Sequence, residues 1–123
     1  TKNETLTTLV GCGGNRDQSK RPLMGKVAAQ LSDKVIFTAD NPRDEDPDVI
    51  IDAMEAGVNP ENYKKTLRIT NREQAIKAAC MSLTPGDVLL IAGKGHENYQ
   101  EIKGIKSPFD DYLIAQKICK QLF

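Results

Sequence analysis

The chain has 123 residues, and its 17 basic and 17 acidic side chains give a formal net charge of zero. This length fits one domain, so we expect residues 1–123 to form a single domain. Balanced charge disfavours nucleic acid and anionic membranes as partners, because both attract a basic excess. Apolar runs such as Val88–Ala92 are far shorter than the ~20 residues of a membrane-spanning helix.

The cysteine content suggests a reducing compartment. Cys12, Cys80 and Cys119 are far apart and odd in number, which fits neither a disulfide framework nor the spacing of zinc ligands. A single histidine excludes a histidine-rich metal site. We therefore expect a cytoplasmic protein with no metal site in this chain. The sequence starts without Met and without a signal-peptide pattern, which suggests a fragment of a longer protein.

Segments typical of strands alternate with segments typical of helices. The expected strands are apolar or β-branched runs that stop at glycine or polar turns, at residues 5–10, 34–39, 67–70 and 87–92. The expected helices cover residues 22–31, 47–55 and 71–83, the last with Asn71 as its N-cap. Residues 99–105 suggest a short hairpin.

A final helix is expected to open at Ser107-Pro108, because proline is favoured in the first turn of a helix. The apolar stripe of this helix has five members, namely Tyr112, Ala115, Ile118, Cys119 and Leu122. Taken together, the alternation predicts an α/β domain with a doubly wound, mostly parallel sheet and helices on both faces. In such sheets, ligands bind beyond the carboxyl ends of the strands. Three polar or glycine-rich loops leave strands at that edge, at residues 11–21, 40–46 and 93–99.

The first loop reads Gly-Cys-Gly-Gly-Asn-Arg-Asp-Gln-Ser-Lys-Arg-Pro. Glycines between a strand and a helix allow backbone N–H groups to bind phosphate or carboxylate. Arg16 stands where a dinucleotide fingerprint needs its third glycine, and no Gly-Lys-[Ser/Thr] sequence follows. A nicotinamide cofactor is therefore disfavoured and a P-loop is excluded. A tight, solvated turn is the alternative, but Arg16, Lys20 and Arg21 together favour anion binding.

The second loop, Asp40-Asn41-Pro42-Arg43, presents an acid, an amide and an arginine within four residues. Arginine can bind a carboxylate through two parallel hydrogen bonds, while Asp and Asn can accept from an ammonium group or orient the arginine. The tetrapeptide is thus a candidate receptor for an amino acid. The alternative is a plain Asx-capped turn, which the four residues taken alone slightly favour. The acidic residues 44–46 are interpreted as the negative first turn of a helix.

The third loop, residues 93–97, reads Gly-Lys-Gly-His-Glu, and its glycines permit close approach of the backbone to a ligand. Glu97 is a candidate acceptor for a ligand ammonium group, whereas His96 is interpreted as structural. Each loop alone is a weak signal. Three such loops at one sheet edge favour a binding site.

Three motifs in this order closely resemble the carboxy-terminal domain of the Mur ligases. They are Gly-Cys-Gly-Gly-Asn-Arg-Asp-Gln-Ser-Lys-Arg-Pro-Leu-Met-Gly, Asp-Asn-Pro-Arg and Gly-Lys-Gly-His-Glu-Asn-Tyr-Gln. The resemblance runs from about Leu6 to about Leu122 and implies a Rossmann-like fold. In that family, Asp-Asn-Pro-Arg marks the members that take meso-diaminopimelate, and lysine-adding members usually depart from it at the arginine.

The resemblance also implies roles for individual residues. Arg16, Asn41 and Arg43 match family positions that contact the amino-acid substrate, and Asp40 matches a supporting position of the same motif. Meso-diaminopimelate carries two ammonium and two carboxylate groups, so its receptor needs arginines and acids side by side.

Four further matches complete this set. Gly93 and Glu97 match family positions that hold the distal end of the substrate. Lys20 and Arg21 match a basic segment close to the nucleotide. No residue of this chain is expected to be catalytic or to bind a metal ion.

The family reaction uses ATP and magnesium to convert a carboxylate of a UDP-N-acetylmuramoyl dipeptide into an acyl phosphate, which the amine of diaminopimelate attacks. In the family, ATP, magnesium and the UDP-sugar are bound by two preceding domains. The resemblance therefore implies that this chain is the amino-acid-binding part of a three-domain bacterial ligase of peptidoglycan biosynthesis. It is expected to be inactive alone, because catalysis requires closure onto the other domains.

Two alternatives stay open. One is a lysine-adding homologue or another amide ligase with the same domain, such as a relative of cyanophycin synthetase or folylpolyglutamate synthetase. Arg43 disfavours the lysine enzyme, because lysine has no second carboxylate to pair with it. The other is a free-standing binding module. A Gly-Lys-[Ser/Thr] loop upstream in the complete reading frame would distinguish a ligase from such a module.

Overall fold

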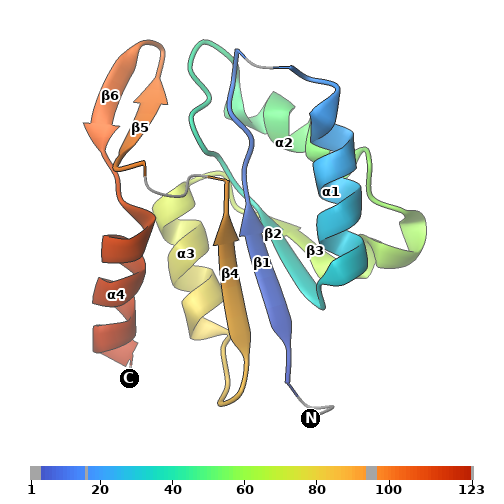
Figure 1. Ribbon diagram of the computed structural model, residues 1–123, viewed down its shortest axis with the longest axis vertical. Coiled ribbons are helices and arrows are strands. Elements are labelled where there is room, and N and C mark those ends of the chain that lie inside the picture. Colours follow the sequence, from blue (N-terminus) through green and yellow to red (C-terminus); the bar gives the residue numbers. More distant parts are fainter. Residues whose placement is uncertain (1–3, 16, 94–96, 123) are drawn as a thin grey trace.

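Figure 1 shows the computed structural model, in which a central sheet lies between two pairs of helices. The structure describes residues 4–15, 17–93 and 97–122. The strands are β1 (Leu6–Val10), β2 (Lys34–Phe37), β3 (Thr66–Arg68), β4 (Val88–Ala92), β5 (Tyr99–Ile102) and β6 (Ile105–Pro108). The helices are α1 (Lys20–Leu31), α2 (Pro47–Glu55), α3 (Arg72–Met81), α4 (Asp111–Leu122) and the short 3₁₀ helix η1 (Pro60–Lys65).

The central sheet has four parallel strands in the order β3-β2-β1-β4, with β1 in the interior. The segments between consecutive strands of this sheet include α1 between β1 and β2 and α3 between β3 and β4. This confirms the predicted Rossmann-like, doubly wound sheet. Strands β5 and β6 form a separate antiparallel hairpin.

Two apolar cores form because the side chains of each strand alternate between the faces of the sheet. Val10 and Phe37 pack with Ile51 and Met54 in the core beneath α1 and α2. On the opposite face, neighbouring strand residues pack with residues of α3 and α4, and this second core contains Leu9, Ile36, Ala75, Ile76, Ala79, Cys80 and Ile118. The predicted helices on both faces are therefore confirmed.

Helices α1 and α2 approach each other closely at two glycines. A Cβ atom on Gly25 of α1 would collide with the carbonyl oxygen of Met54 in α2, and one on Gly57 would collide with the carbonyl oxygen of Pro22. This contact lets α1 and α2 pack side by side over one face of the sheet. It also fixes the start of α1, which lies at the carboxyl end of β1.

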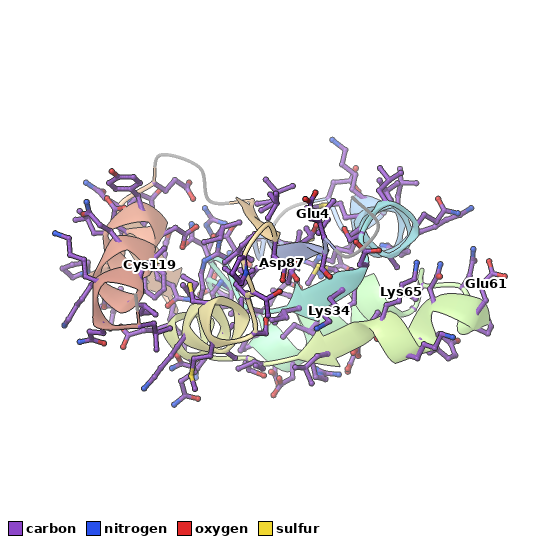
Figure 2. The ribbon with its side chains drawn as sticks, turned by 90° about the horizontal axis from the view of Figure 1, so that it is seen from below. Glu4, Lys34, Glu61, Lys65, Asp87 and Cys119 are labelled. Atoms are coloured by element: carbon purple, nitrogen blue, oxygen red, sulfur yellow. The ribbon has the colours of Figure 1, made fainter. Side chains whose placement is uncertain are left out.

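The opposite edge of the sheet, where the strands begin, is the end seen in Figure 2. Asp87 connects two strands there: its Oδ1 accepts a hydrogen bond from the backbone N of Thr5 and its Oδ2 accepts one from the backbone N of Thr84, both at 2.9 Å. These bonds lower the pKa of Asp87, with the bond from Thr84 as the largest cause. The carboxylate thus joins the start of β1 to the turn before β4.

The last helix begins later than the sequence suggests. Ser107 and Pro108 belong to β6, where they pair with Gln100 and Tyr99 of β5, and α4 begins at Asp111. Proline is tolerated here because Pro108 occupies the end of an edge strand, where its missing N–H removes no interior ladder bond. Of the expected apolar stripe, Ile118 is buried, whereas Tyr112 is 72% exposed.

The N-cap of α3 forms as predicted, with Asn71 Oδ1 accepting from the backbone N of Gln74 at 3.0 Å. No described helix is long and apolar enough to cross a membrane.

Candidate functional site

Three loops converge at the carboxyl ends of the parallel strands, as the fold class predicts. The backbone N of Gly14, in the loop after β1, donates to the carbonyl oxygen of Asn41 in the loop after β2 at 2.7 Å. Gly93, directly after β4, has a φ of +106°, and a Cβ there would come within 2.8 Å of the carbonyl oxygen of Gly11. Glycine is thus required at position 93 both by its backbone conformation and by the nearby loop.

Asn41 connects the second and third loops. Its side chain is almost fully buried, at 1% exposure. The amide Nδ2 donates to Glu97 Oε1 at 3.2 Å, and Oδ1 accepts from the backbone N of Glu101 at 2.9 Å. Since the amide is engaged on both sides, it fixes the position of Glu97 and docks the β5–β6 hairpin against the loop after β2.

Glu97 is half-buried at the start of the hairpin segment. Besides the bond from Asn41, its Oε2 accepts a hydrogen bond from the hydroxyl of Tyr99 at 3.4 Å. Two neutral donors therefore orient the carboxylate. Such an arrangement can also accept hydrogen bonds from an ammonium group of a ligand.

Asp40 and Lys20 lie beside a hollow of about 190 Å³ between the loops after β1, β2 and β4. Asp40 is buried at 6% exposure, and its carbonyl oxygen accepts from Gln100 Nε2 at 2.7 Å. Lys20 is exposed as the first residue of α1, two positions before the predicted start of that helix. The hollow thus combines a buried acid with an exposed ammonium group at a helix N-terminus.

Arg43 sits in a constrained backbone conformation, with a φ of +53°. Its Nη1 donates to the carbonyl oxygens of Gly14 at 3.1 Å and Asn41 at 3.4 Å. Its Nε lies 3.3 Å from Glu101 Oε1, and the side chain is 14% exposed. The guanidinium is therefore held by protein groups on two of its three nitrogens.

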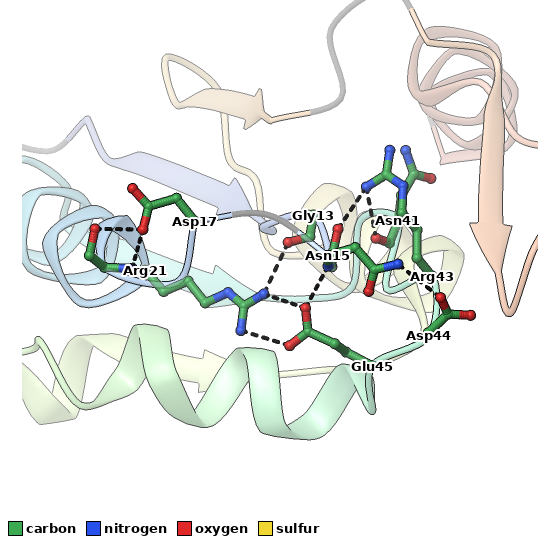
Figure 3. A network of polar contacts seen from close by, with 10 residues as sticks. Gly13, Asn15, Asp17, Arg21, Asn41, Arg43, Asp44 and Glu45 are labelled. Atoms are coloured by element: carbon green, nitrogen blue, oxygen red, sulfur yellow. Dashed lines mark hydrogen bonds and ion pairs between the residues drawn. The ribbon is translucent and has the colours of Figure 1, made fainter.

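Arg21 is bound to protein groups and supports the loops of the site. The side chain is only 3% exposed, and its Nη1 and Nη2 donate to the two carboxylate oxygens of Glu45 at 3.0 and 2.8 Å. Nη2 also donates to the carbonyl oxygen of Gly13 at 3.2 Å. Figure 3 shows this network, in which Arg21 bridges the glycine loop and the start of α2.

The acidic residues 44–46 do more than begin a helix. Asp46 is the N-cap of α2, as its sequence position suggests. Glu45 Oε2 also accepts from the backbone N of Asn15 at 2.6 Å, and Asp44 Oδ2 accepts from the side chain of Asn15 at 2.9 Å. The pKa of Glu45 is lowered, mainly by its hydrogen bonds with Arg21 and next by the bond from Asn15. These contacts hold Asn15 against the acidic segment.

Of the sequence-predicted site residues, the structure brings together Asn41, Arg43 and Glu97, with Asp40 and Gly93 beside them. Arg16 lies outside the described residues, as does His96. Sequence reasoning missed Glu45 and Glu101, which hold Arg21 and Arg43. Only the neighbouring charges in the sequence gave a signal for them, because their partners are distant along the chain. Within the described residues, no three His, Cys, Asp or Glu side chains form a candidate metal site.

Comparison with known proteins identifies close relatives. Residues 1–95 match the family model described as "Mur ligase, glutamate ligase domain". A UDP-N-acetylmuramoyl-L-alanyl-D-glutamate--2,6-diaminopimelate ligase from Cytophaga hutchinsonii is 53% identical over 117 residues, which is 95% of this chain and 24% of that protein. The enzyme of the same name from Parabacteroides distasonis is 60% identical over 106 residues, or 86% of this chain and 22% of that protein.

A solved structure of a ligase with the same name superposes with a TM-score of 0.90 at 42% identity. It covers 96% of this chain, which corresponds to 24% of the other chain. The chain thus spans about a quarter of the length of these relatives.

Proposed function

Because the chain belongs to the Mur ligase family, we propose that it binds the incoming amino acid of a meso-diaminopimelate-adding ligase. Within that family, it matches the glutamate ligase domain. The complete protein would join diaminopimelate to a UDP-N-acetylmuramoyl dipeptide in bacterial peptidoglycan synthesis, in the cytoplasm. The relatives' printed name and the proximity of Arg43 and Glu97 to Asn41 support this function. The single observation that carries it is the presence of an oriented cation and an oriented anion at one sheet edge.

The geometry suits a doubly zwitterionic ligand. The Glu97 carboxylate, oriented by Asn41 and Tyr99, is complementary to an ammonium group. The Arg43 guanidinium is complementary to a carboxylate. With Asp40 as a supporting acid and Arg16 as a further cation, the six proposed substrate residues would recognise diaminopimelate, and Gly93 and Glu97 would lie at its distal end.

The contribution of this chain to the reaction is positioning. In the complete enzyme, ATP and magnesium would activate the acceptor carboxylate as an acyl phosphate. The residues of this domain would hold diaminopimelate so that one of its amines attacks the acyl carbon, with phosphate as the leaving group, and domain closure would exclude water. Arg43 and Glu97 bind the ligand and undergo no chemical change in this proposal.

We infer that the described residues of this chain do not form a triphosphate site. The sequence has no Gly-Lys-[Ser/Thr] loop, and Arg21, predicted to lie near the nucleotide, directs its guanidinium to Glu45. Lys20, exposed at the start of α1, fits a nucleotide-proximal role better than Arg21. We assign no step of the reaction to nucleotide contacts in this domain.

Substitution of Arg43 tests the proposal. In the full-length enzyme, Arg43→Ala should lower kcat/KM for diaminopimelate far more than for lysine, which lacks the second carboxylate. Because Nη1 already donates to two carbonyl groups, we expect the loss of one charge-assisted bond of about 1.5–3 kcal/mol, or roughly 10- to 150-fold. Arg43→Lys should restore little, since one ammonium group cannot keep the carbonyl and carboxylate contacts of the guanidinium and also donate to the ligand.

The outcomes separate the candidate functions. An equal loss for both amino acids would mean that Arg43 supports the fold or the reacting end of the substrate. No loss for either would contradict the proposal. A full-length protein that prefers lysine would identify the lysine-adding alternative, and one that binds diaminopimelate without forming an amide would identify a binding module.

A further inference from the structure

Arg43 is held by one residue of the hairpin at two levels. The backbone N of Arg43 donates to the carbonyl oxygen of Glu101 at 3.0 Å. The Nε of Arg43 lies 3.3 Å from Glu101 Oε1, an ion pair between side chains that are 14% and 22% exposed. Glu101 therefore fixes both the backbone and the guanidinium of Arg43.

The remaining contacts of Arg43 leave one nitrogen for a ligand. Nη1 is directed to the carbonyl oxygens of Gly14 and Asn41, and Nε is directed to Glu101. Among the described residues, Nη2 has no hydrogen-bond partner, and in the close view of Figure 3 it points away from the network. A guanidinium without the Glu101 contact could turn about its last torsions and present a different edge.

We propose that Glu101 is a positioning residue that orients Arg43, so that Nη2 is presented to the second carboxylate of the substrate. The inference rests on the proposed function and adds a specificity-determining residue to it. Electrostatics alone would argue against an acid at this position, because a carboxylate beside Arg43 weakens the attraction for an anionic group. The benefit of Glu101 lies in orientation, since a side chain fixed before binding loses less entropy when the ligand binds.

The hairpin should remain docked when the Glu101 side chain is changed. The bonds between residue 101 and the loop after β2 use its backbone N and carbonyl oxygen. Two other bonds do not involve Glu101. Gln100 Nε2 donates to the carbonyl oxygen of Asp40, and the backbone N of Lys103 donates to the carbonyl oxygen of Arg43. Substitution of Glu101 therefore removes the orienting contact and keeps the local fold.

The test measures kcat and KM for diaminopimelate and for lysine in the full-length enzyme. Glu101→Ala should raise KM for diaminopimelate about 5- to 10-fold, on the order of one weakened charge-assisted bond, with kcat near wild type. Kinetics with lysine should stay unchanged. Glu101→Gln keeps an acceptor near Nε and should restore most of the loss. Glu61→Ala, at an exposed position in η1, is the control and should leave both substrates unaffected.

The Arg43→Ala background isolates the pairwise effect. There, Glu101→Ala should cause no further loss with diaminopimelate. Tighter binding of diaminopimelate by Glu101→Ala would overturn the inference, because it would show that the acid only weakens the charge of Arg43. An equal loss with both amino acids, together with a lower Tm, would overturn it in favour of a purely structural role.

Failure of this inference is distinct from failure of the proposed function. A preference for diaminopimelate that is abolished by Arg43→Ala and unchanged by Glu101→Ala would overturn the positioning role alone. A wild-type enzyme with no preference for diaminopimelate would overturn the proposed function, and the positioning role with it.

Discussion

The guanidinium of Arg72 forms a two-point ion pair with the carboxylate of Asp111, with Nε 2.8 Å from Oδ1 and Nη2 2.7 Å from Oδ2. Both residues are buried, Arg72 at 1% and Asp111 at 6% exposure. Arg72 Nη1 also donates to the carbonyl oxygen of Ala39, just beyond β2, at 3.1 Å. The pair thus joins the first residues of α3 and α4 to the edge of the sheet that contains the candidate site.

Removal of the Asp111 carboxylate should therefore be costly. Asp111→Ala leaves a buried guanidinium without its anion, and breaking a buried pair in this way costs about 3–5 kcal/mol. For a domain of this size we expect Tm to fall by roughly 10–20 °C. Thermal unfolding followed by circular dichroism measures the effect. The matched control is Asp52→Ala, which breaks an exposed ion pair with Arg68 and should cost at most about 1 kcal/mol. Equal Tm values for the two variants would contradict the assignment.

The close contact at Gly25 predicts that alanine at this position lowers the stability of the fold, whereas helix propensity alone predicts that it raises it. Alanine is favoured over glycine inside a helix by about 1 kcal/mol. Nevertheless, Gly25→Ala should destabilise the chain by about 1–3 kcal/mol, because its Cβ would collide with the Met54 carbonyl group of α2. Urea unfolding measures the change. Lys26→Ala, at an exposed neighbouring position, should be nearly neutral. A Gly25→Ala variant at least as stable as the wild type would refute the close packing.

Glu45 gives the chain an acid-sensitive contact. Its pKa is lowered in the folded state, chiefly by Arg21. The stabilisation is therefore present above the unfolded pKa of about 4.3 and is lost as pH falls through the lower, folded value. Glu45→Gln should cost about 1–3 kcal/mol at pH 7. The difference from wild type should shrink at pH 3, because this pH lies below the unfolded pKa and the stabilisation falls as pH approaches the lower, folded value.

Urea unfolding at both pH values checks this dependence. Glu61→Gln, at an exposed glutamate, should show little difference from the wild type at either pH. If the cost of Glu45→Gln were the same at pH 7 and pH 3, the ionised carboxylate of Glu45 would not be the source of the stabilisation.

The fold, and the convergence of three loops at the sheet edge that carries the candidate site, were predictable from local patterns. The four parallel strands follow from short apolar runs, and the site edge follows from the loops at their carboxyl ends. The Asn71 cap was predictable because its partner Gln74 lies three residues away. These features depend on neighbouring residues, which a sequence displays directly.

The missed features depend on residues that are distant in the sequence. Arg72 follows the N-cap and resembles a surface residue of a first turn, yet its partner Asp111 is 39 positions away. Glu45 resembles an ordinary acid near a helix start, and its partner Arg21 lies 24 positions earlier. The predicted start of α4 was wrong because Ser107-Pro108 has the local pattern of a helix start. Pairing with β5 places both residues in a strand instead.

The central claim is that this sheet edge binds an amino acid with a second carboxylate. Calorimetric titration of the full-length protein with meso-diaminopimelate and with lysine tests it most directly. The UDP-N-acetylmuramoyl dipeptide and a non-hydrolysable ATP analogue should be present, so that the domains can close. We predict that diaminopimelate binds at least about tenfold more tightly than lysine, as the loss of one charge-assisted bond implies. Equal affinities, or tighter binding of lysine, would contradict the claim.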